Sequence, residues 1–316
     1  MHTDDTVKNI YICSSARSGS TLLDLLLGSH SQIESLGEIN QLSKNISLNS
    51  VCTCGTPVRS CRLWKEVIKE LNRKLNINIF ENPYSLNIGY PNPIRVKDDI
   101  HKSIRYNLER KVLKGGKLIA LTYNLFFLDR LFYKLNQGLK NTILLYETVR
   151  EKSHCKIVVD SSKTYIEAIG IYRLQPKNTR IILLSRDGRG VLNSKLKSQI
   201  PLKKAVKGWI NHYKRSLELF NRYIDNQHIL FLKYEDVAID PSKMLTKVCD
   251  FIGVDFEEEM IDFSRHLHHI ANGNEMRFIK NSTIKLDNCW KDELPEKSRL
   301  YFEQKAMKIN TLLGYY

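Results

Sequence analysis

The feature that most constrains the fold is a recurring alternation of short apolar runs with helical segments. The first run, Val7 to Ser14, ends in small residues, and a helix is expected soon after it over Thr21 to Gly28. Later strands are expected at Cys155 to Asp160, Arg180 to Ser185 and His228 to Lys233, with helices from Tyr165, over Gly188 to Leu196 and over Pro241 to Ile252. Because these strands are nearly continuous apolar runs, the pattern predicts an α/β fold whose parallel sheet is covered by helices on both faces.

The segment between the first helix and the second strand of this pattern is rich in helices instead. Four lysine-rich amphipathic helices are expected there: Trp64 to Leu75, Asp98 to Lys114, Leu118 to Leu135 and Leu139 to Lys152. We therefore predict a single domain over residues 1–316 that carries a helical insertion at about residues 62–152.

The chain has a formal net charge of +15, which says more about partners than about fold. The basic residues are spread along the sequence, which is atypical of a nucleic-acid-binding tail and is compatible with an anionic ligand. No apolar run reaches the roughly 18 residues that a transmembrane helix needs. The polar start of the chain lacks the basic and apolar parts of a secretory signal, so we expect a cytoplasmic protein.

Three of the seven cysteines, Cys52, Cys54 and Cys61, lie close together in the sequence. Their spacing supplies three thiol ligands for zinc, but no fourth ligand is obvious nearby, and His30 is the nearest earlier histidine. A disulfide is an equally open alternative that a reducing cytoplasm disfavours. We expect no metal site.

The loop after the first strand has the composition of a phosphate-binding turn. Backbone N–H groups at the start of a helix attract phosphate oxygens, and small residues let the backbone approach closely. The loop resembles a nucleoside-triphosphate P-loop, except that Ser20 stands where that motif has its lysine, so a diphosphate-like group suits it better than a triphosphate with magnesium. The candidate donor-binding residues are Ser15, Ala16, Arg17, Ser18, Gly19, Ser20 and Thr21.

A second anion site is expected where the strand Arg180 to Ser185 ends. Arg186 follows this strand, and Ser194 comes a little over two helical turns later. Arginine can hold a phosphate through two hydrogen bonds, and ligands of open α/β sheets bind at the carboxyl ends of strands. Two such strand ends favour a ligand with two separated phosphates.

The order of the segments SSARSGSTLL and LLSRDGRGVLNS resembles that of the sulfotransferase family, whose members transfer a sulfuryl group from 3′-phosphoadenosine 5′-phosphosulfate (PAPS). Leu36-Gly37-Glu38-Ile39, Val159-Asp160-Ser161-Ser162-Lys163 and Leu232-Lys233-Tyr234-Glu235-Asp236 are similar to further segments of bacterial and tyrosine-type members, and so is the cysteine cluster followed by Trp64. The resemblance implies a P-loop-like fold, with PAPS as co-substrate and no metal requirement.

The same resemblance assigns roles to individual residues. Glu38 becomes the base that activates an acceptor hydroxyl, and Lys163 and Arg17 become the cations near the transferred group. The loop binds the 5′ end of PAPS, while Arg186 and Ser194 bind its 3′-phosphate. Tyr234 and, in a loosely matched late basic segment, Arg277 complete the expected donor site.

The acceptor is expected to be a small molecule or glycan, or more broadly the hydroxyl of a carbohydrate, a lipid, a small metabolite or a tyrosine. A P-loop kinase of small molecules, with Asp160 as the magnesium-binding acid, is the main alternative. A basic nucleic-acid-binding protein ranks lower, so nucleic acid is not an expected partner.

Overall fold

The computed structural model describes residues 6–89, 133–279 and 283–316. Within these ranges, one sheet has the strand order β2-β3-β1-β4-β5, and all of its pairings are parallel. The strands are β1 (Asn9–Ser14), β2 (Ile33–Ser35), β3 (Ile157–Lys163), β4 (Thr179–Ser185) and β5 (Ile229–Lys233). The sheet therefore confirms the α/β fold that the alternating pattern predicts.

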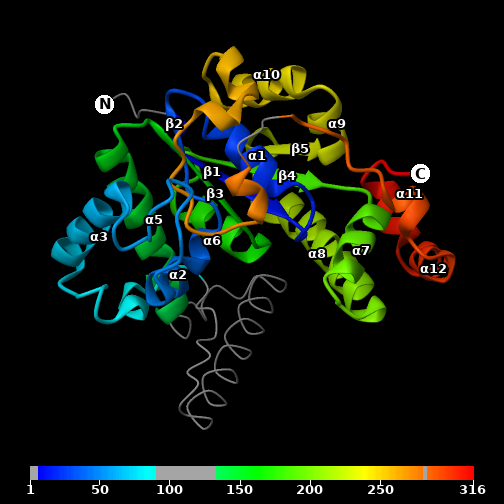
Figure 1. The fold of residues 1–316 in the computed structure, drawn as a ribbon, viewed down its shortest axis with the longest axis horizontal. Helices are drawn as coiled ribbons and strands as arrows, with labels where there is room; N and C mark the ends of the chain where they lie inside the picture. Colours follow the sequence, from blue (N-terminus) through cyan, green and yellow to red (C-terminus); the bar gives the residue numbers. More distant parts are fainter. Residues whose placement is uncertain (1–5, 90–132, 280–282) are drawn as a thin grey trace, which may run out of the picture.

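Helices surround this sheet (Figure 1). The α-helices are α1 (Ser20–Leu27), α2 (Leu42–Leu48), α3 (Arg62–Leu75), α5 (Tyr133–Ser153), α6 (Tyr165–Leu174), α7 (Gly188–Lys197), α8 (Leu202–Tyr223), α9 (Tyr234–Ile239), α10 (Pro241–Ile252), α11 (Trp290–Glu293) and α12 (Glu296–Leu312). The short 3-10 helices are η1 (Ile39–Gln41), η2 (Pro83–Leu86), η4 (Asn226–His228), η5 (Glu258–Ile261), η6 (Phe263–Arg265) and η7 (Glu275–Phe278). No helix of the described residues is long and apolar enough to cross a membrane.

Alternate residues of β1 point to opposite faces of the sheet, as a strand requires. Ile10 and Ile12 belong to one buried cluster, together with apolar residues of α1, α9 and α10. Tyr11 and Cys13 belong to the other, with residues of α3, α5, α6, α8 and α12. Both faces of the sheet are thus covered by helices, which explains why its central strands β1 and β4 are mostly apolar.

The predicted elements agree with the observed ones to within a few residues, with informative exceptions. The helix expected over Trp64 to Leu75 is α3, and α10 has the predicted bounds. The helix expected over Asp98 to Lys114 lies outside the described residues, as does nearly all of the next one. The sequence reasoning missed β2, α2, α8, α9, α11 and α12.

Candidate functional site

The site lies where three neighbouring strands end. In the sheet, β1 lies between β3 and β4, with Cys13 paired to Lys163 and Ser14 paired to Leu184. Because all three strands are parallel, the loop after β1, the last residue of β3 and the first residues after β4 meet at one edge. A cavity of about 730 Å³ opens there. The cavity wall includes Ala16, Arg17, Gly19, Ser20, Thr21, Leu22, Glu38, Lys163, Arg186, Ser194, Tyr234, Gly273, Asn274, Glu275, Met276, Ile284, Lys285 and Asp287.

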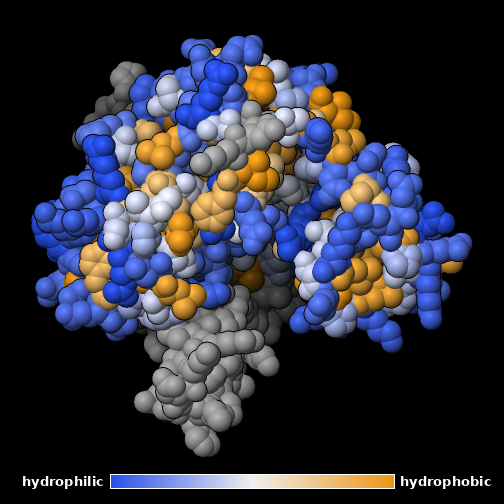
Figure 2. Space-filling view, viewed as in Figure 1, coloured by the Kyte–Doolittle hydropathy of each residue, from blue (hydrophilic) through white to orange (hydrophobic). Residues whose placement is uncertain are grey.

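The space-filling view shows a hollow between the part of the molecule that carries α7, α11 and α12 and the rest of the described chain (Figure 2). The wall of the cavity carries the cations Arg17, Lys163, Arg186 and Lys285. Three carboxylates, Glu38, Glu275 and Asp287, stand among them. The cavity is therefore polar and mixed in charge, as a site for an anionic ligand with a proton acceptor beside it would be.

Gly19 joins the donor loop to α1. Its φ of 83° is in the left-handed region, and it is the residue before the first turn of the helix. A Cβ at this position would lie 2.4 Å from Cδ2 of Tyr234. Two separate features therefore require glycine at position 19: the left-handed backbone conformation and the close approach of the Tyr234 ring.

The side chains of Ser15 and Ser18 do not line the cavity but anchor the loop from behind. Ser18 Oγ lies 3.1 Å from the hydroxyl of Tyr213, which donates to the carbonyl of Leu184 at 2.9 Å. Lys195 Nζ donates to Ser15 Oγ at 3.1 Å, and burial lowers the pKa of this lysine to about 8. Both hydroxyls are thus engaged by the protein in this structure, and the assignment of Ser15 and Ser18 to the donor site stays a prediction.

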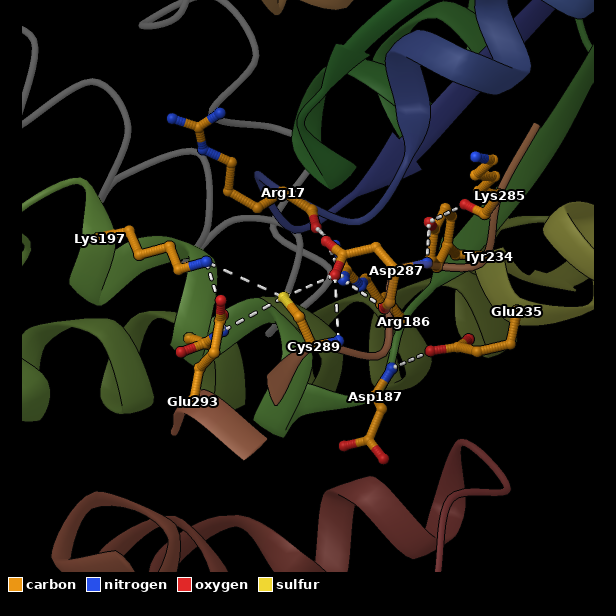
Figure 3. A network of polar contacts seen from close by, with 11 residues as sticks. Arg17, Arg186, Asp187, Lys197, Tyr234, Glu235, Lys285, Asp287, Cys289 and Glu293 are labelled. Atoms are coloured by element: carbon orange, nitrogen blue, oxygen red, sulfur yellow. Dashed lines mark hydrogen bonds and ion pairs between the residues drawn. The ribbon is translucent and has the colours of Figure 1, made fainter. Parts of the chain in front are cut away.

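Arg186 is held at the edge of the sheet by several contacts (Figure 3). Its Nη2 donates to the carbonyl of Asp287 at 2.8 Å and forms an ion pair with the carboxylate of that residue at 2.8 Å. Its Nη1 donates to the carbonyl of Arg17 at 3.3 Å, and its guanidinium lies 4.6 Å from the centre of the Tyr234 ring. A carboxylate thus already occupies the position in which Arg186 would bind an anion.

Ser194 lines the same cavity from α7, as the spacing from Arg186 predicts. The helix begins after Asp187, whose carboxylate accepts from the N–H of Arg189 at 2.9 Å. Asp187 also forms an ion pair with Arg189 at 2.6 Å. Its neighbour Arg186 therefore remains directed at the cavity.

Tyr234 follows β5 and forms a wall of the cavity between the donor loop and Arg186. Its hydroxyl accepts from the N–H of Asp287 at 3.0 Å and donates to the carbonyl of Lys285 at 3.4 Å. The next residue, Glu235, accepts from the N–H of Asp187 at 3.0 Å. The Tyr-Glu pair therefore ties the end of β5 to the start of α7.

Glu38 and Lys163 form an ion pair in the cavity wall, and both side chains are largely but not fully buried. Glu38 follows Gly37, whose φ is 66°, and a Cβ on that glycine would lie 2.5 Å from Cγ2 of Ile270. Lys163 ends β3 just after the register shifts against β1, between Tyr11 and Cys13. Two segments distant in sequence thus deliver a carboxylate and an ammonium group to one point.

Arg17 and Lys163 share an unusual backbone conformation, with a φ of 75° at each. A left-handed conformation is uncommon for residues other than glycine, and such residues cluster at functional sites. The guanidinium of Arg17 donates to Ser198 Oγ at 2.9 Å, at the end of α7. The side chain of Arg17 thus points away from Arg186 in this conformation (Figure 3).

Arg277 does not contribute to the cavity wall, although the sequence assigned it to the donor site. Its Nη1 donates to the carbonyl of Gly273 at 2.5 Å, and its guanidinium lies 4.4 Å from the centre of the Phe278 ring. Burial lowers the pKa of its guanidinium. Lys285, which the sequence reasoning missed, lines the cavity instead.

Asp160, the magnesium ligand of the kinase alternative, is buried beneath the site. Its carboxylate accepts from the N–H of Ser162 at 2.7 Å and from the hydroxyl of Tyr146. Burial raises the pKa of Asp160 to about 7. This carboxylate is not part of the cavity wall, so it is poorly placed to hold a metal against a bound nucleotide.

A comparison with protein-family models decides the family. The model described as the sulfotransferase domain matches residues 8–308. The chain is a sulfotransferase. The match includes every residue of the candidate site, and it confirms the family that the sequence motifs resemble.

Two solved structures of sulfotransferase domains are similar in fold to this sulfotransferase. The sulfotransferase domain from the curacin biosynthetic pathway is 20% identical, with a TM-score of 0.52 and coverage of 98% of each chain. The sulfotransferase domain of the Synechococcus PCC 7002 olefin synthase is 18% identical, with a TM-score of 0.53 and coverage of 96% of this chain and 95% of that chain. These likenesses show a shared fold.

Among curated proteins, sulfotransferase 1C2 of Rattus norvegicus is 41% identical over 54 residues. The matched stretch is 17% of this chain and 17% of the rat protein. The similarity is therefore local in both proteins.

Proposed function

We propose that this sulfotransferase uses PAPS as its donor. The observation that supports this most strongly is the sheet order, because the loop after β1 and Arg186 after β4 open into one cavity from adjacent strands. The N–H groups at the start of α1 would hold the 5′-phosphosulfate. Arg186 and Ser194 would hold the 3′-phosphate, which a donor with a single phosphate group lacks.

The 3′-phosphate would displace the carboxylate of Asp287 from Arg186. The guanidinium can present two parallel N–H groups to a phosphate, and such charge-assisted pairs are stronger than neutral hydrogen bonds. The contact of Arg186 with the Tyr234 ring, 4.6 Å from guanidinium to ring centre, keeps the group oriented during the exchange. Lys285 adds a second positive charge to the cavity wall nearby.

The reaction is an in-line displacement at sulfur. The acceptor hydroxyl oxygen forms a bond to sulfur while the bond from sulfur to the 5′-phosphate oxygen breaks, and the products are a sulfate ester and adenosine 3′,5′-bisphosphate. Glu38 takes the proton of the hydroxyl. Lys163, the loop N–H groups and Arg17, once its side chain turns from Ser198, stabilise the charge that develops on the leaving phosphate. The acceptor hydroxyl belongs to a small molecule, a glycan, a lipid or a tyrosine.

Ligand-induced thermal stabilisation tests the donor assignment. Adenosine 3′,5′-bisphosphate at 100 times its Kd should stabilise the protein by about 2.7 kcal/mol, whereas adenosine 5′-monophosphate and Mg-ATP at the same concentration should stabilise it far less. Arg186→Ala should abolish the advantage of the bisphosphate over the monophosphate. Equal stabilisation by the two adenosine nucleotides would contradict the proposal, and stabilisation by Mg-ATP alone would favour a kinase.

Turnover tests the base, with a labelled sulfuryl donor and a screen of hydroxyl acceptors. Glu38→Gln should lower kcat by about 10²- to 10⁴-fold, because general base catalysis typically contributes that much, while donor binding is kept. Glu275→Gln is the matched control, since it removes another carboxylate from the same cavity wall and should change kcat little. Near-normal turnover by Glu38→Gln with unchanged folding would show that another group accepts the proton.

A further inference from the structure

The three clustered cysteines meet a histidine that comes much later in the chain. The ligand atoms of Cys52, Cys54, Cys61 and His269 all lie within 4.8 Å of one another. Cys61 Sγ is 3.2 Å from His269 Nδ1, across a separation of 208 residues. In the parts of the chain that the structure describes, no other group of histidine, cysteine and acidic residues has this geometry.

We propose that these four residues bind a structural zinc ion. Zinc prefers thiolate and imidazole ligands in a tetrahedron, with bonds of about 2.3 Å to sulfur and 2.0–2.1 Å to nitrogen. Such a tetrahedron places its ligand atoms roughly 3.5–3.8 Å apart. The observed separations, 3.2 Å between Cys61 and His269 and at most 4.8 Å for any pair, need only small shifts to reach this spacing. Three sulfur ligands and one nitrogen ligand exclude magnesium and calcium, which select oxygen.

The backbone around the cysteines is shaped as a turn that directs them to one point. The N–H of Gly55 donates to the carbonyl of Cys52 at 2.9 Å, and the N–H of Cys52 donates to the carbonyl of Thr56 at 2.8 Å. Gly55 has a φ of 85°, and no other group approaches its open side. Cys52 and Cys61 are buried, while Cys54 is partly exposed, which leaves a route for an ion to enter.

His269 is held in place by the residues around the cysteines. Trp64 Nε1, from the helix that follows Cys61, donates to the carbonyl of His269 at 2.7 Å. On either side of the histidine, the hydroxyl of Thr53 donates to the carbonyl of His268 at 2.5 Å and accepts from the N–H of Ile270 at 2.9 Å. Hydrogen bonds that do not involve the thiols thus hold the segment around His269 against Thr53 and Trp64.

His30, the histidine nearest to the cysteines on the N-terminal side, is committed elsewhere. Its Nε2 lies 2.9 Å from the carbonyl of Asp255, and its Nδ1 accepts from the N–H of Gln32 at 3.0 Å. Both ring nitrogens are therefore used, and the fourth ligand comes from the far end of the sequence. The expectation that the chain has no metal site rested on the missing fourth ligand, which the fold supplies.

A zinc ion with three thiolates and one neutral imidazole carries a net charge of −1. Arg277 lies in the segment that follows His269, and its Nε is buried without a hydrogen-bond partner within the described residues. A cation in this segment would help to balance the charge of the ligand set.

The proposed site is structural because all four positions are filled by the protein. The bound ion would cross-link the turn at residues 52–61 to the segment at residues 268–277 (Figure 1). That segment carries Gly273 and Asn274 of the cavity wall, and its Ile270 packs against Gly37 beside Glu38. Loss of the ion should therefore loosen the donor cavity without removing any group that takes part in the reaction.

Metal analysis of the full-length chain, purified under reducing conditions after expression with added zinc, tests the proposal. We expect about one zinc ion per wild-type chain. The zinc content should fall at least tenfold in Cys54→Ser and in His269→Ala, and it should be retained in His269→Cys, which keeps four zinc-binding side chains. Cys155→Ser is the matched control, since Cys155 is partly exposed like Cys54 but lies outside the cluster. Retention of zinc by both ligand variants would overturn the proposal.

A second measurement avoids variants that fail to fold. Cobalt added to metal-depleted wild-type protein should produce the ligand-field bands of a tetrahedral site and a sulfur-to-cobalt charge-transfer band, and zinc should displace it. No such spectrum, or a disulfide between two of the three cysteines found by mass spectrometry in the metal-free native protein, would overturn the proposal. Neither readout depends on PAPS, so a failure here is distinct from a failure of the proposed donor.

Discussion

Replacing Gly19 with alanine is predicted to be unusually destabilising, because two separate costs add at this position. A side chain at a φ of 83° strains the backbone by about 1–2 kcal/mol. The new Cβ would lie 2.4 Å from Cδ2 of Tyr234, and forcing an extra methyl group against a packed ring typically costs about 1–3 kcal/mol. We expect Gly19→Ala to lower the free energy of unfolding by about 2–5 kcal/mol in total.

Gly253→Ala separates the two costs. Gly253 has a φ of 77° at the end of α10, and a Cβ there would meet nothing within 4 Å. Gly253→Ala has the same backbone strain as Gly19→Ala and the same reduction in the entropy of the unfolded chain. It lacks the collision with an aromatic ring. Urea unfolding of the two variants should show that Gly19→Ala is less stable than Gly253→Ala by at least about 1 kcal/mol.

A double-mutant cycle identifies the colliding group. In a Tyr234→Ala background, Gly19→Ala should cost no more than Gly253→Ala does in the wild type, since only the strain remains. The ring also lies against Arg186, so Gly19→Ala should weaken stabilisation by adenosine 3′,5′-bisphosphate as well. Equal costs at Gly19 and Gly253 would refute the close packing of Tyr234 against the donor loop.

Three further substitutions test other contacts of the site. Asp287→Asn should raise the affinity for adenosine 3′,5′-bisphosphate a few-fold, about 0.5–1 kcal/mol by calorimetry, because the competing carboxylate leaves Arg186. Tyr213→Phe should destabilise the fold by about 1–3 kcal/mol in urea, since the N–H of Ser15 and other partners lose its hydroxyl. Asp24→Asn should flatten the pH dependence of stability, because burial raises the pKa of Asp24 from 3.8 to about 7.

The sign of the last prediction follows from the direction of the shift. A carboxyl whose pKa is raised by folding stabilises the native state fully below its unfolded pKa of 3.8, and this stability is lost as the pH rises to about 7. The loss attributable to Asp24 is at most about 4 kcal/mol. Unfolding measured at several pH values in this window should show a smaller slope for Asp24→Asn than for the wild type, and an unchanged slope would contradict the assignment.

The other two predictions have equally direct controls. Tyr301→Phe removes a hydroxyl from α12 away from the donor loop and should leave stability nearly unchanged. If Asp287→Asn binds the bisphosphate less tightly than the wild type, the carboxylate supports the donor site instead of competing with it.

The sequence predicts which residues at the strand ends could bind an anion, but it does not predict where each strand ends. The loop after β1 and the pair Arg186 and Ser194 were predictable, because a small-residue turn and an arginine after an apolar strand have local signatures. The extension of β3 to Lys163 was not predictable, since the polar residues after Asp160 are typical of a loop. The short strand β2 was missed for a related reason, because three residues are too few to show a period.

Other parts of the site depend on contacts that have no local signal. Tyr213 lies within the long helix α8, and nothing in its neighbours indicates that its hydroxyl supports the donor loop. Asp287 and His269 act through partners about 100 and 208 residues away. The positive φ of Arg17 and Lys163 is a product of the folded environment, because the local sequence does not favour it.

The position of β1 in the sheet has a consequence for how the chain folds as it is synthesised. β1 pairs with β3 and β4, while β2 pairs with β3, so the first two strands to leave the ribosome have no direct partnership. The first contact of β1 in the register joins Asn9 to Val158, about half of the chain later. At typical rates of about 5–20 residues per second, the nascent chain carries an apolar strand with two unpaired edges for many seconds.

The donor loop can therefore take its shape only after β3 and β4 have emerged and enclosed β1. A nascent chain that stops before β3 should bind no nucleotide and should be a strong client for chaperones that recognise exposed apolar strands. The strand that organises the donor site is thus made early but gains its second neighbour only when β4 has emerged.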